Sequence, residues 1–144
     1  MKEVLFVCVN NVGRSQMAES IYNETRPGQA ESAGTTVDEP DGVVGDWAGG
    51  PELIMQVQNE NGPDISRNKR TQLTEDMLQE YGRVIIMAQS ETWPAYLQIG
   101  GHINQWVVHD PVNMSVEEIR RIHALVKVRV EELLSGFGKQ ANQA

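Results

Sequence analysis

The sequence contains a single cysteine, Cys8, and an arginine, Arg14, follows it six positions later. A thiolate is a nucleophile, and a guanidinium can donate two parallel hydrogen bonds to a tetrahedral oxyanion. Ser15, directly after the arginine, is able to cap a helix and to donate a hydrogen bond to sulfur. These side chains predict a site that binds a phosphate-like anion and attacks it with a thiolate. The alternative is a buried strand cysteine and a solvated surface arginine, the usual fate of each residue type.

The elements around these residues support the first interpretation. The apolar run over residues 3–9 predicts a buried strand, and residues 15–24 place apolar side chains on one face of a helix. In a strand–loop–helix turn, the loop N–H groups and the helix N-terminus form an anion cradle, and the same field favours a thiolate. We therefore assign oxyanion binding to Val9, Asn10, Asn11, Val12, Gly13, Arg14 and Ser15.

The rest of the chain alternates between strand and helix patterns. Strands are expected over 29–33, 83–87 and 104–108. Helices are expected over 51–59, from Thr74 to Gly82, over 91–97, and from a capping box at residues 115–118 to Gly136. Residues 34–50 form a Gly-, Asp- and Pro-rich loop. The expected organisation is one domain over residues 1–137 and a polar tail over 138–144.

This alternation predicts the α/β class, as a three-layer sandwich with a four-stranded parallel sheet and helices on both faces. Ligands of such sheets bind at the carboxyl ends of the strands. Both Cys8 and Asp110 stand at such ends, so Asp110 is a candidate general acid for the leaving group. Alternatively, Asp110 caps a turn before Pro111.

Composition narrows the function further. The net charge of −8 disfavours nonspecific binding to nucleic acid or to anionic membranes. A single cysteine excludes an internal disulfide and a thiolate-rich zinc site, and the three histidines share no ligand spacing, so no metal or cofactor is expected. The apolar runs are short for a membrane span, and the first residues do not have the pattern of a signal peptide, so a cytoplasmic location is expected.

The segment CVNNVGRSQMAE, residues 8–19, resembles the signature of the low-molecular-weight protein tyrosine phosphatases and the related phosphatase-like arsenate reductases. Further matches are SAGT at 32–35, DIS at 64–66, RVIIMA at 83–88 and Asp110-Pro111. The resemblance extends from Lys2 to about Phe137. It implies that Cys8 is the nucleophile, Arg14 binds the equatorial oxygens and Asp110 is the general acid. It also implies that Asn11 holds the loop backbone and that Ser15 stabilises the thiolate.

The resemblance implies a phosphomonoesterase that forms a phosphocysteine and acts on a phosphorylated protein or a small aryl phosphate. In the family's phosphatases a second cysteine usually precedes the arginine, where this chain has Gly13, so an internal redox lock is excluded. Asn10 replaces the usual glycine, and asparagine tolerates the positive φ expected there. Trp47, in the 34–50 loop, is a candidate substrate wall, and it fits equally a residue that pins the loop.

Two other functions remain open. Gln16, where phosphatases favour proline, leans toward the arsenate reductase branch. That activity would need an external small thiol and a redoxin partner, since residues 87–94 hold no further cysteine. The third hypothesis is a non-catalytic module that binds oxyanions.

Overall fold

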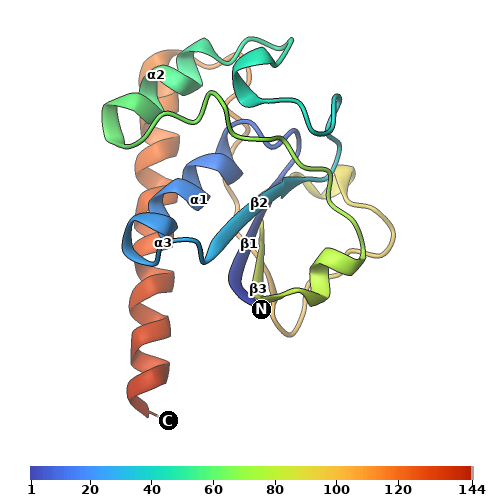
Figure 1. Ribbon diagram of the computed structural model, residues 1–144, viewed down its shortest axis with the longest axis vertical. Coiled ribbons are helices and arrows are strands. Elements are labelled where there is room, and N and C mark those ends of the chain that lie inside the picture. Colours follow the sequence, from blue (N-terminus) through green and yellow to red (C-terminus); the bar gives the residue numbers. More distant parts are fainter. Residues whose placement is uncertain (144) are drawn as a thin grey trace.

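The computed structural model describes the backbone of residues 1–143 and the side chains of residues 1–136. Its sheet consists of β1 (Lys2–Cys8), β2 (Ala30–Gly34), β3 (Tyr81–Ile86) and β4 (Ile103–Gln105). The strands are all parallel and follow the order β2-β1-β3-β4 (Figure 1). The predicted α/β fold with a four-stranded parallel sheet is therefore confirmed. The register pairs Cys8 with Gly34, so β1 and β2 end side by side at the proposed site.

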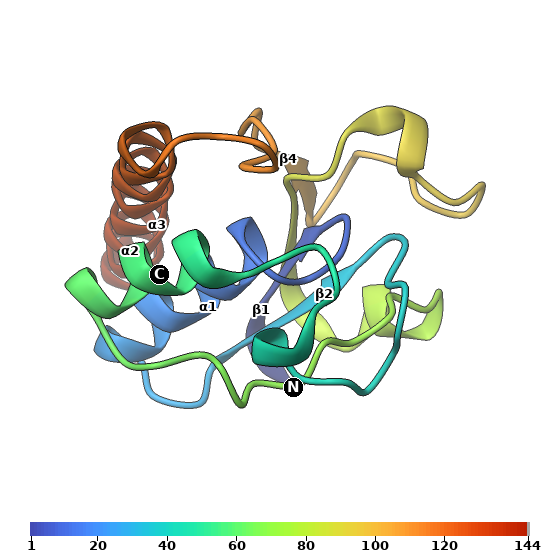
Figure 2. The same cartoon turned by 90° about the horizontal axis from the view of Figure 1, so that it is seen from above.

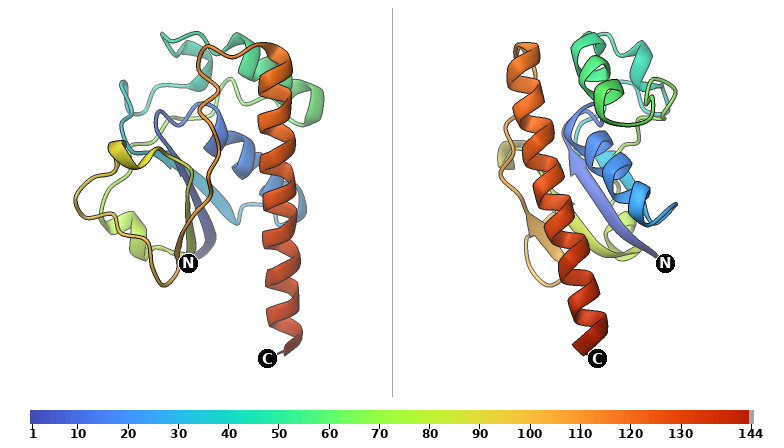
Figure 3. Two further views of the ribbon diagram at one scale, coloured as in Figure 1. Left: turned by 180° about the vertical axis from the view of Figure 1, so that it is seen from behind. Right: turned by 90° about the vertical axis from the view of Figure 1, so that its left-hand side faces the viewer.

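The three α-helices gather on one side of the sheet. They are α1 (Arg14–Thr25), α2 (Glu52–Asn61) and α3 (Val116–Gln143), and Figures 2 and 3 show them together. Val4 and Phe6 of β1 belong to the same apolar cluster as residues of all three helices. As predicted, a capping box begins α3: Glu118 N–H donates to Ser115 Oγ, and Ser115 N–H donates to the Glu118 carboxylate.

The opposite side of the sheet is covered by shorter structure. Leu5 and Val7 of β1 cluster there with side chains from segments 73–78 and 93–97. The helices on this side are the 3-10 helices η2 (Asp76–Gln79) and η3 (Ser90–Thr92), while η1 (Val44–Asp46) lies in the long loop. The third layer is thus built from 3-10 turns and loops, because a few buried side chains suffice to cover a four-stranded sheet.

Several boundaries differ from the expectation. The helix predicted from Thr74 to Gly82 is reduced to η2, and Tyr81 begins β3 instead, paired with Lys2. Sheet pairing and a hydrogen bond from Tyr81 Oη to Glu31 outweigh the local helical pattern. The helix predicted over 91–97 is only η3, and the strand predicted over 104–108 is the shorter β4.

The last helix is longer than predicted. It continues past Gly136 to Gln143, and residue 144 lies outside the described residues. Glycine in an exposed helix costs only about 1 kcal/mol relative to alanine and need not end it. Among the described residues, no helix combines the length and the apolar composition needed to cross a membrane.

Gly34 is the point where β2 meets the loop that follows β1. Thr35 N–H donates to Cys8 O at 2.8 Å, and Thr36 N–H donates to Val9 O at 3.0 Å. A Cβ atom on Gly34 would lie 2.2 Å from Val9 O and 3.0 Å from Asn11 N. The loop backbone therefore rests directly on the backbone of β2, which leaves no space for a side chain.

We predict that Gly34→Ala lowers the free energy of unfolding by about 1–3 kcal/mol, because the new methyl group forces the loop away from β2. Urea denaturation measures the change. The matched control is Gly136→Ala, in α3, where a Cβ meets no atom within 4 Å and helix propensity predicts a gain of up to about 1 kcal/mol. Equal stability of Gly34→Ala and the wild type would contradict the packing argument.

Candidate active site

A pocket at the carboxyl end of β1 contains the predicted functional side chains. Cys8 lies at its floor with 3% of its surface exposed. Arg14, Asp110 and Trp47 also line the pocket, as do Asn10, Val12, Gly13, Ile54, Pro111 and Val112. Residues from three distant parts of the sequence are thus brought together around one sulfur atom. Of the predicted loop residues, Val9, Asn11 and Ser15 do not line the pocket; Asn11 and Ser15 lie behind it and are fully buried.

A chain of hydrogen bonds ends at the sulfur. Thr71 N–H donates to Asn11 Oδ1 at 2.8 Å, and Asn11 Nδ2 donates to Ser15 Oγ at 2.7 Å. Ser15 Oγ lies 2.9 Å from Cys8 Sγ. Because Ser15 already accepts a hydrogen bond from Asn11, its own hydrogen is available to the sulfur. This arrangement directs a hydrogen-bond donor at the Cys8 sulfur.

The loop turns at Asn11, which has a φ of +57°. Asparagine is one of the few residues that adopts this left-handed conformation without large strain. Asn10 is not among the residues with positive φ, so the expectation of a positive φ there was wrong. The left-handed residue is the next one, Asn11, and both polar atoms of its side chain are held by hydrogen bonds.

Two buried side chains hold the loop carbonyls from outside. Gln16 Nε2 donates to Asn11 O at 3.1 Å, and Arg70 Nε donates to Asn10 O at 3.2 Å. Gln16 also bonds Lys69 O and Asn68 Nδ2. Gln16, the residue that favoured the arsenate reductase branch in the sequence, therefore also has a structural role: it holds the loop backbone.

The N–H groups of the loop remain unpaired. The described residues provide no acceptor for the backbone N–H groups of residues 10–13. These groups precede the N-terminus of α1, whose dipole adds positive potential. Unpaired amides at a helix N-terminus are the usual protein site for a phosphate-like anion.

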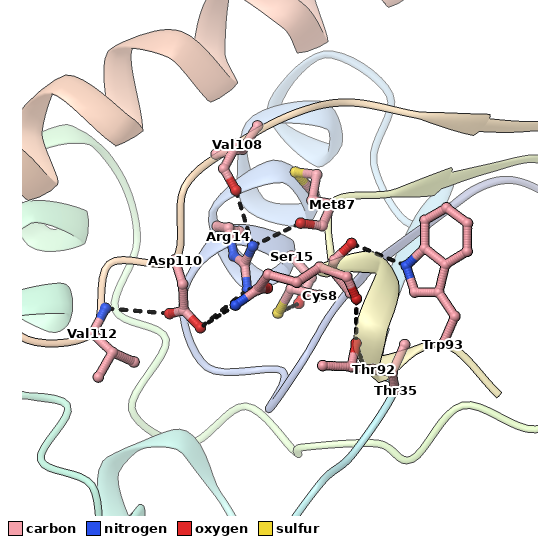
Figure 4. Close-up of polar contacts among 12 residues, drawn as sticks. Cys8, Arg14, Ser15, Thr35, Met87, Thr92, Trp93, Val108, Asp110 and Val112 are labelled. Atoms are coloured by element: carbon pink, nitrogen blue, oxygen red, sulfur yellow. Dashed lines mark hydrogen bonds and ion pairs between the residues drawn. The ribbon is translucent and has the colours of Figure 1, made fainter.

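Arg14 is buried, with 2% of its side chain exposed, so it is not a solvated surface charge. Its Nη1 donates to Met87 O at 2.6 Å and to Val108 O at 2.9 Å, as Figure 4 shows. Its Nη2 donates to Gln89 Oε1 at 2.9 Å and lies 3.4 Å from Asp110 Oδ2. Nε has no acceptor among the described residues, so its N–H is available to a ligand.

The Asp110 carboxylate caps a turn and also lines the pocket. Its Oδ1 accepts a hydrogen bond from Val112 N–H at 3.2 Å, which caps the turn around Pro111. Its Oδ2 accepts one from Gln89 Nε2 at 3.2 Å and faces Arg14. The side chain remains 30% exposed and lines the pocket.

Trp47 also fits both interpretations. Its Nε1 donates to Asp38 Oδ2 at 3.2 Å, and the Arg70 guanidinium lies 5.9 Å from its ring centroid. The hydrogen bond from Arg70 holds the pKa of Asp38 below its usual value. These contacts pin the loop, and the half-buried ring still borders the pocket.

Sequence reasoning missed Arg70, Gln16 and Gln89 as parts of the site. Arg70 belongs to a run of charges, which normally indicates a solvated face, yet it is 1% exposed. No sequence signal separates it from its exposed neighbours. Gln89 follows β3 closely, so the rule that ligands bind at strand ends could have identified it.

A model of the family described as "Low molecular weight phosphotyrosine protein phosphatase" matches residues 3–143. A "Putative arsenate reductase" of Halobacterium salinarum is 26% identical over 135 residues, which cover 92% of this chain and 90% of that protein. A "Probable low molecular weight protein-tyrosine-phosphatase EpsP" of Ralstonia solanacearum is 27% identical over 92 residues, 63% of this chain and 59% of its own.

Solved structures share the fold. The crystal structure of a low molecular weight protein tyrosine phosphatase from T. tengcongensis aligns with a TM-score of 0.75 and 24% identity, covering 94% of this chain and 99% of that one. The family model spans nearly all of the sequence and includes both Cys8 and Asp110. The chain therefore belongs to the low molecular weight phosphotyrosine protein phosphatase family.

Proposed function

We propose that this protein is a phosphomonoesterase that uses Cys8 as its nucleophile and forms a phosphocysteine intermediate. One observation carries the proposal: the sulfur lies at the floor of a pocket beside unpaired loop N–H groups and a buried guanidinium. Such donors stabilise the charge on the equatorial oxygens of a reacting phosphoryl group without reorganising.

The reaction takes two steps. In the first, Cys8 Sγ forms a bond to phosphorus, the bond to the ester oxygen breaks, and Asp110 donates its proton to that oxygen. In the second, water attacks phosphorus, Asp110 accepts a proton from it, and the sulfur–phosphorus bond breaks to release phosphate. Arg14 and the loop amides bind the phosphoryl oxygens in both steps.

The walls of the pocket favour an aryl ester. Apolar side chains line the pocket beside its polar groups: Val12, Ile54, Pro111, Val112 and the ring of Trp47. An aromatic leaving group buries more apolar surface against such walls than a short alkyl chain does. This supports a phosphorylated tyrosine or a small aryl phosphate as the substrate class.

Arsenate reduction is the second candidate, and the name of the Halobacterium salinarum relative favours it. Arsenate has the shape and charge of phosphate, so the same donors fit it. Reduction of arsenate to arsenite takes two electrons, which two thiols supply as they become a disulfide. Since Cys8 is the only cysteine, at least one thiol must come from an external small thiol, with a redoxin to recycle it.

Cys8→Ser should reduce hydrolysis of p-nitrophenyl phosphate by at least about 10³-fold, because a hydroxyl replaces the nucleophilic sulfur. Assays at mildly acidic pH measure the change, and circular dichroism verifies the fold. Undiminished turnover would exclude Cys8 as the nucleophile. A wild type that binds phosphate without hydrolysing any ester or reducing arsenate would leave the non-catalytic module.

The loss of activity in Asp110→Asn should depend on the leaving group of the ester. We expect kcat/KM for phenyl phosphate, which reports the first step alone, to fall by about 10²- to 10⁴-fold, and kcat/KM for p-nitrophenyl phosphate by much less, since p-nitrophenolate departs without a proton. Asp41→Asn, at an exposed carboxyl outside the pocket, is the matched control. Equal losses with both esters would argue against an acid role for Asp110.

The two enzymatic functions separate in one assay. The wild type is incubated with arsenate, glutathione or mycothiol, and the matching redoxin system, and consumption of the reductant is followed. If the protein is the proposed phosphatase, arsenate inhibits ester hydrolysis and causes no reductant consumption. Arsenate-dependent consumption that disappears in Cys8→Ser would instead establish the reductase.

A further inference from the structure

The side-chain amide of Gln89 lies between Arg14 and Asp110. Its Oε1 accepts a hydrogen bond from Arg14 Nη2 at 2.9 Å, and its Nε2 donates to Asp110 Oδ2 at 3.2 Å. With the 3.4 Å contact between Arg14 and Asp110, both of which Figure 4 labels, the three groups form a closed triangle. A guanidinium only donates and a carboxylate only accepts, so the amide has one possible orientation.

The backbone that carries Gln89 is also fixed. Gln89 O accepts hydrogen bonds from Thr92 Oγ1 at 2.7 Å and from Thr92 N–H at 2.9 Å. Thr92 Oγ1 in turn accepts one from Thr35 Oγ1 after β2, and Trp93 Nε1 donates to Ala88 O. Figure 4 shows this turn beside the site. The amide therefore projects from a turn that is tied to its neighbours.

The neutrality of Gln89 matters because of the charges next to it. Within the described side chains, Asp110 is the only carboxylate at ion-pair distance from Arg14. A carboxylate at position 89 would place a second anion beside the same guanidinium. A neutral amide satisfies the Nη2 donor while it leaves the positive charge for an incoming dianion.

We propose, on the basis of the phosphatase function above, that Gln89 is a positioning residue for the proposed reaction. Its hydrogen bonds set the separation between the guanidinium and the carboxyl group of Asp110. Its lack of charge keeps Arg14 attractive to the phosphoryl oxygens. The two effects are separable, because one variant removes the hydrogen bonds and another adds a charge.

Gln89→Met tests the hydrogen bonds, since methionine has similar length and neither donor nor acceptor of comparable strength. We expect kcat/KM for phenyl phosphate to fall about 5- to 10-fold, the effect of one or two lost hydrogen bonds. The value for p-nitrophenyl phosphate should change by less than about 3-fold, since its leaving group needs no proton. The matched control is Gln105→Met, at an exposed glutamine at the end of β4, for which neither value should change.

Gln89→Glu tests the charge. We expect the dissociation constant of inorganic phosphate, measured by calorimetry at neutral pH, to rise at least about 10-fold through repulsion. In Gln89→Met it should stay within about 3-fold of the wild type. Thermal unfolding of each variant verifies that the fold is kept.

The outcomes distinguish this inference from the proposed function. Equal losses with both esters in Gln89→Met, or kinetics equal to those of Gln105→Met, would overturn the positioning role. Phosphate binding that is the same in Gln89→Glu and Gln89→Met would overturn the role of its neutrality. A wild type that neither hydrolyses phosphate esters nor binds phosphate would overturn the phosphatase function and this inference with it.

Discussion

A guanidinium withdrawn from water is the constraint on which the site depends. Burial of a positive charge is costly unless its donors are paired, and both Nη groups of Arg14 donate to acceptors from two segments. Met87 and Gln89 follow β3, while Val108 and Asp110 follow β4. Arg14 therefore links the segments that follow two neighbouring strands, and the same bonds that stabilise its charge also fix its position relative to Cys8.

In the loop of residues 9–13, which we call the anion loop, the carbonyl groups and the N–H groups have different partners. Its carbonyls are bound from outside, Asn11 O by Gln16 and Asn10 O by Arg70, while the amides of residues 10–13 have no protein partner. The left-handed turn at Asn11 makes this division possible, since it reverses the direction of the backbone groups. Gly34 supports the loop from below, because only a residue without a side chain allows β2 so close.

The sequence predicted those features that depend on local order. Arg14, before a helix, is six positions after Cys8, at a strand end, so their proximity follows from the strand–loop–helix turn itself. Asp110 was placed by a topological rule for parallel sheets. The family resemblance then agreed with both positions, and the family model includes them.

Features that depend on distant contacts were not predictable in this way. Arg70 is buried although its neighbours Arg67 and Lys69 are exposed, because Asp38 and Asn10, from other segments, accept its hydrogen bonds. The local sequence pattern predicts a helix at Tyr81, but pairing with Lys2 of β1 places it in β3. The covering of the second face by 3-10 helices likewise reflects the sheet beneath it rather than the local pattern.

The absence of a side chain at Gly13 leaves room for the turn that carries Asp110. A Cβ atom there would lie 3.1 Å from Pro111 Cγ and 3.5 Å from Ile54 Cδ1. A cysteine at this position, which could form a disulfide with Cys8, would therefore press against the turn that carries Asp110. With glycine, Pro111 packs directly on the anion loop. The chain has no second thiol to protect its nucleophile, and the absence of a side chain at residue 13 leaves room for Pro111 beside the loop.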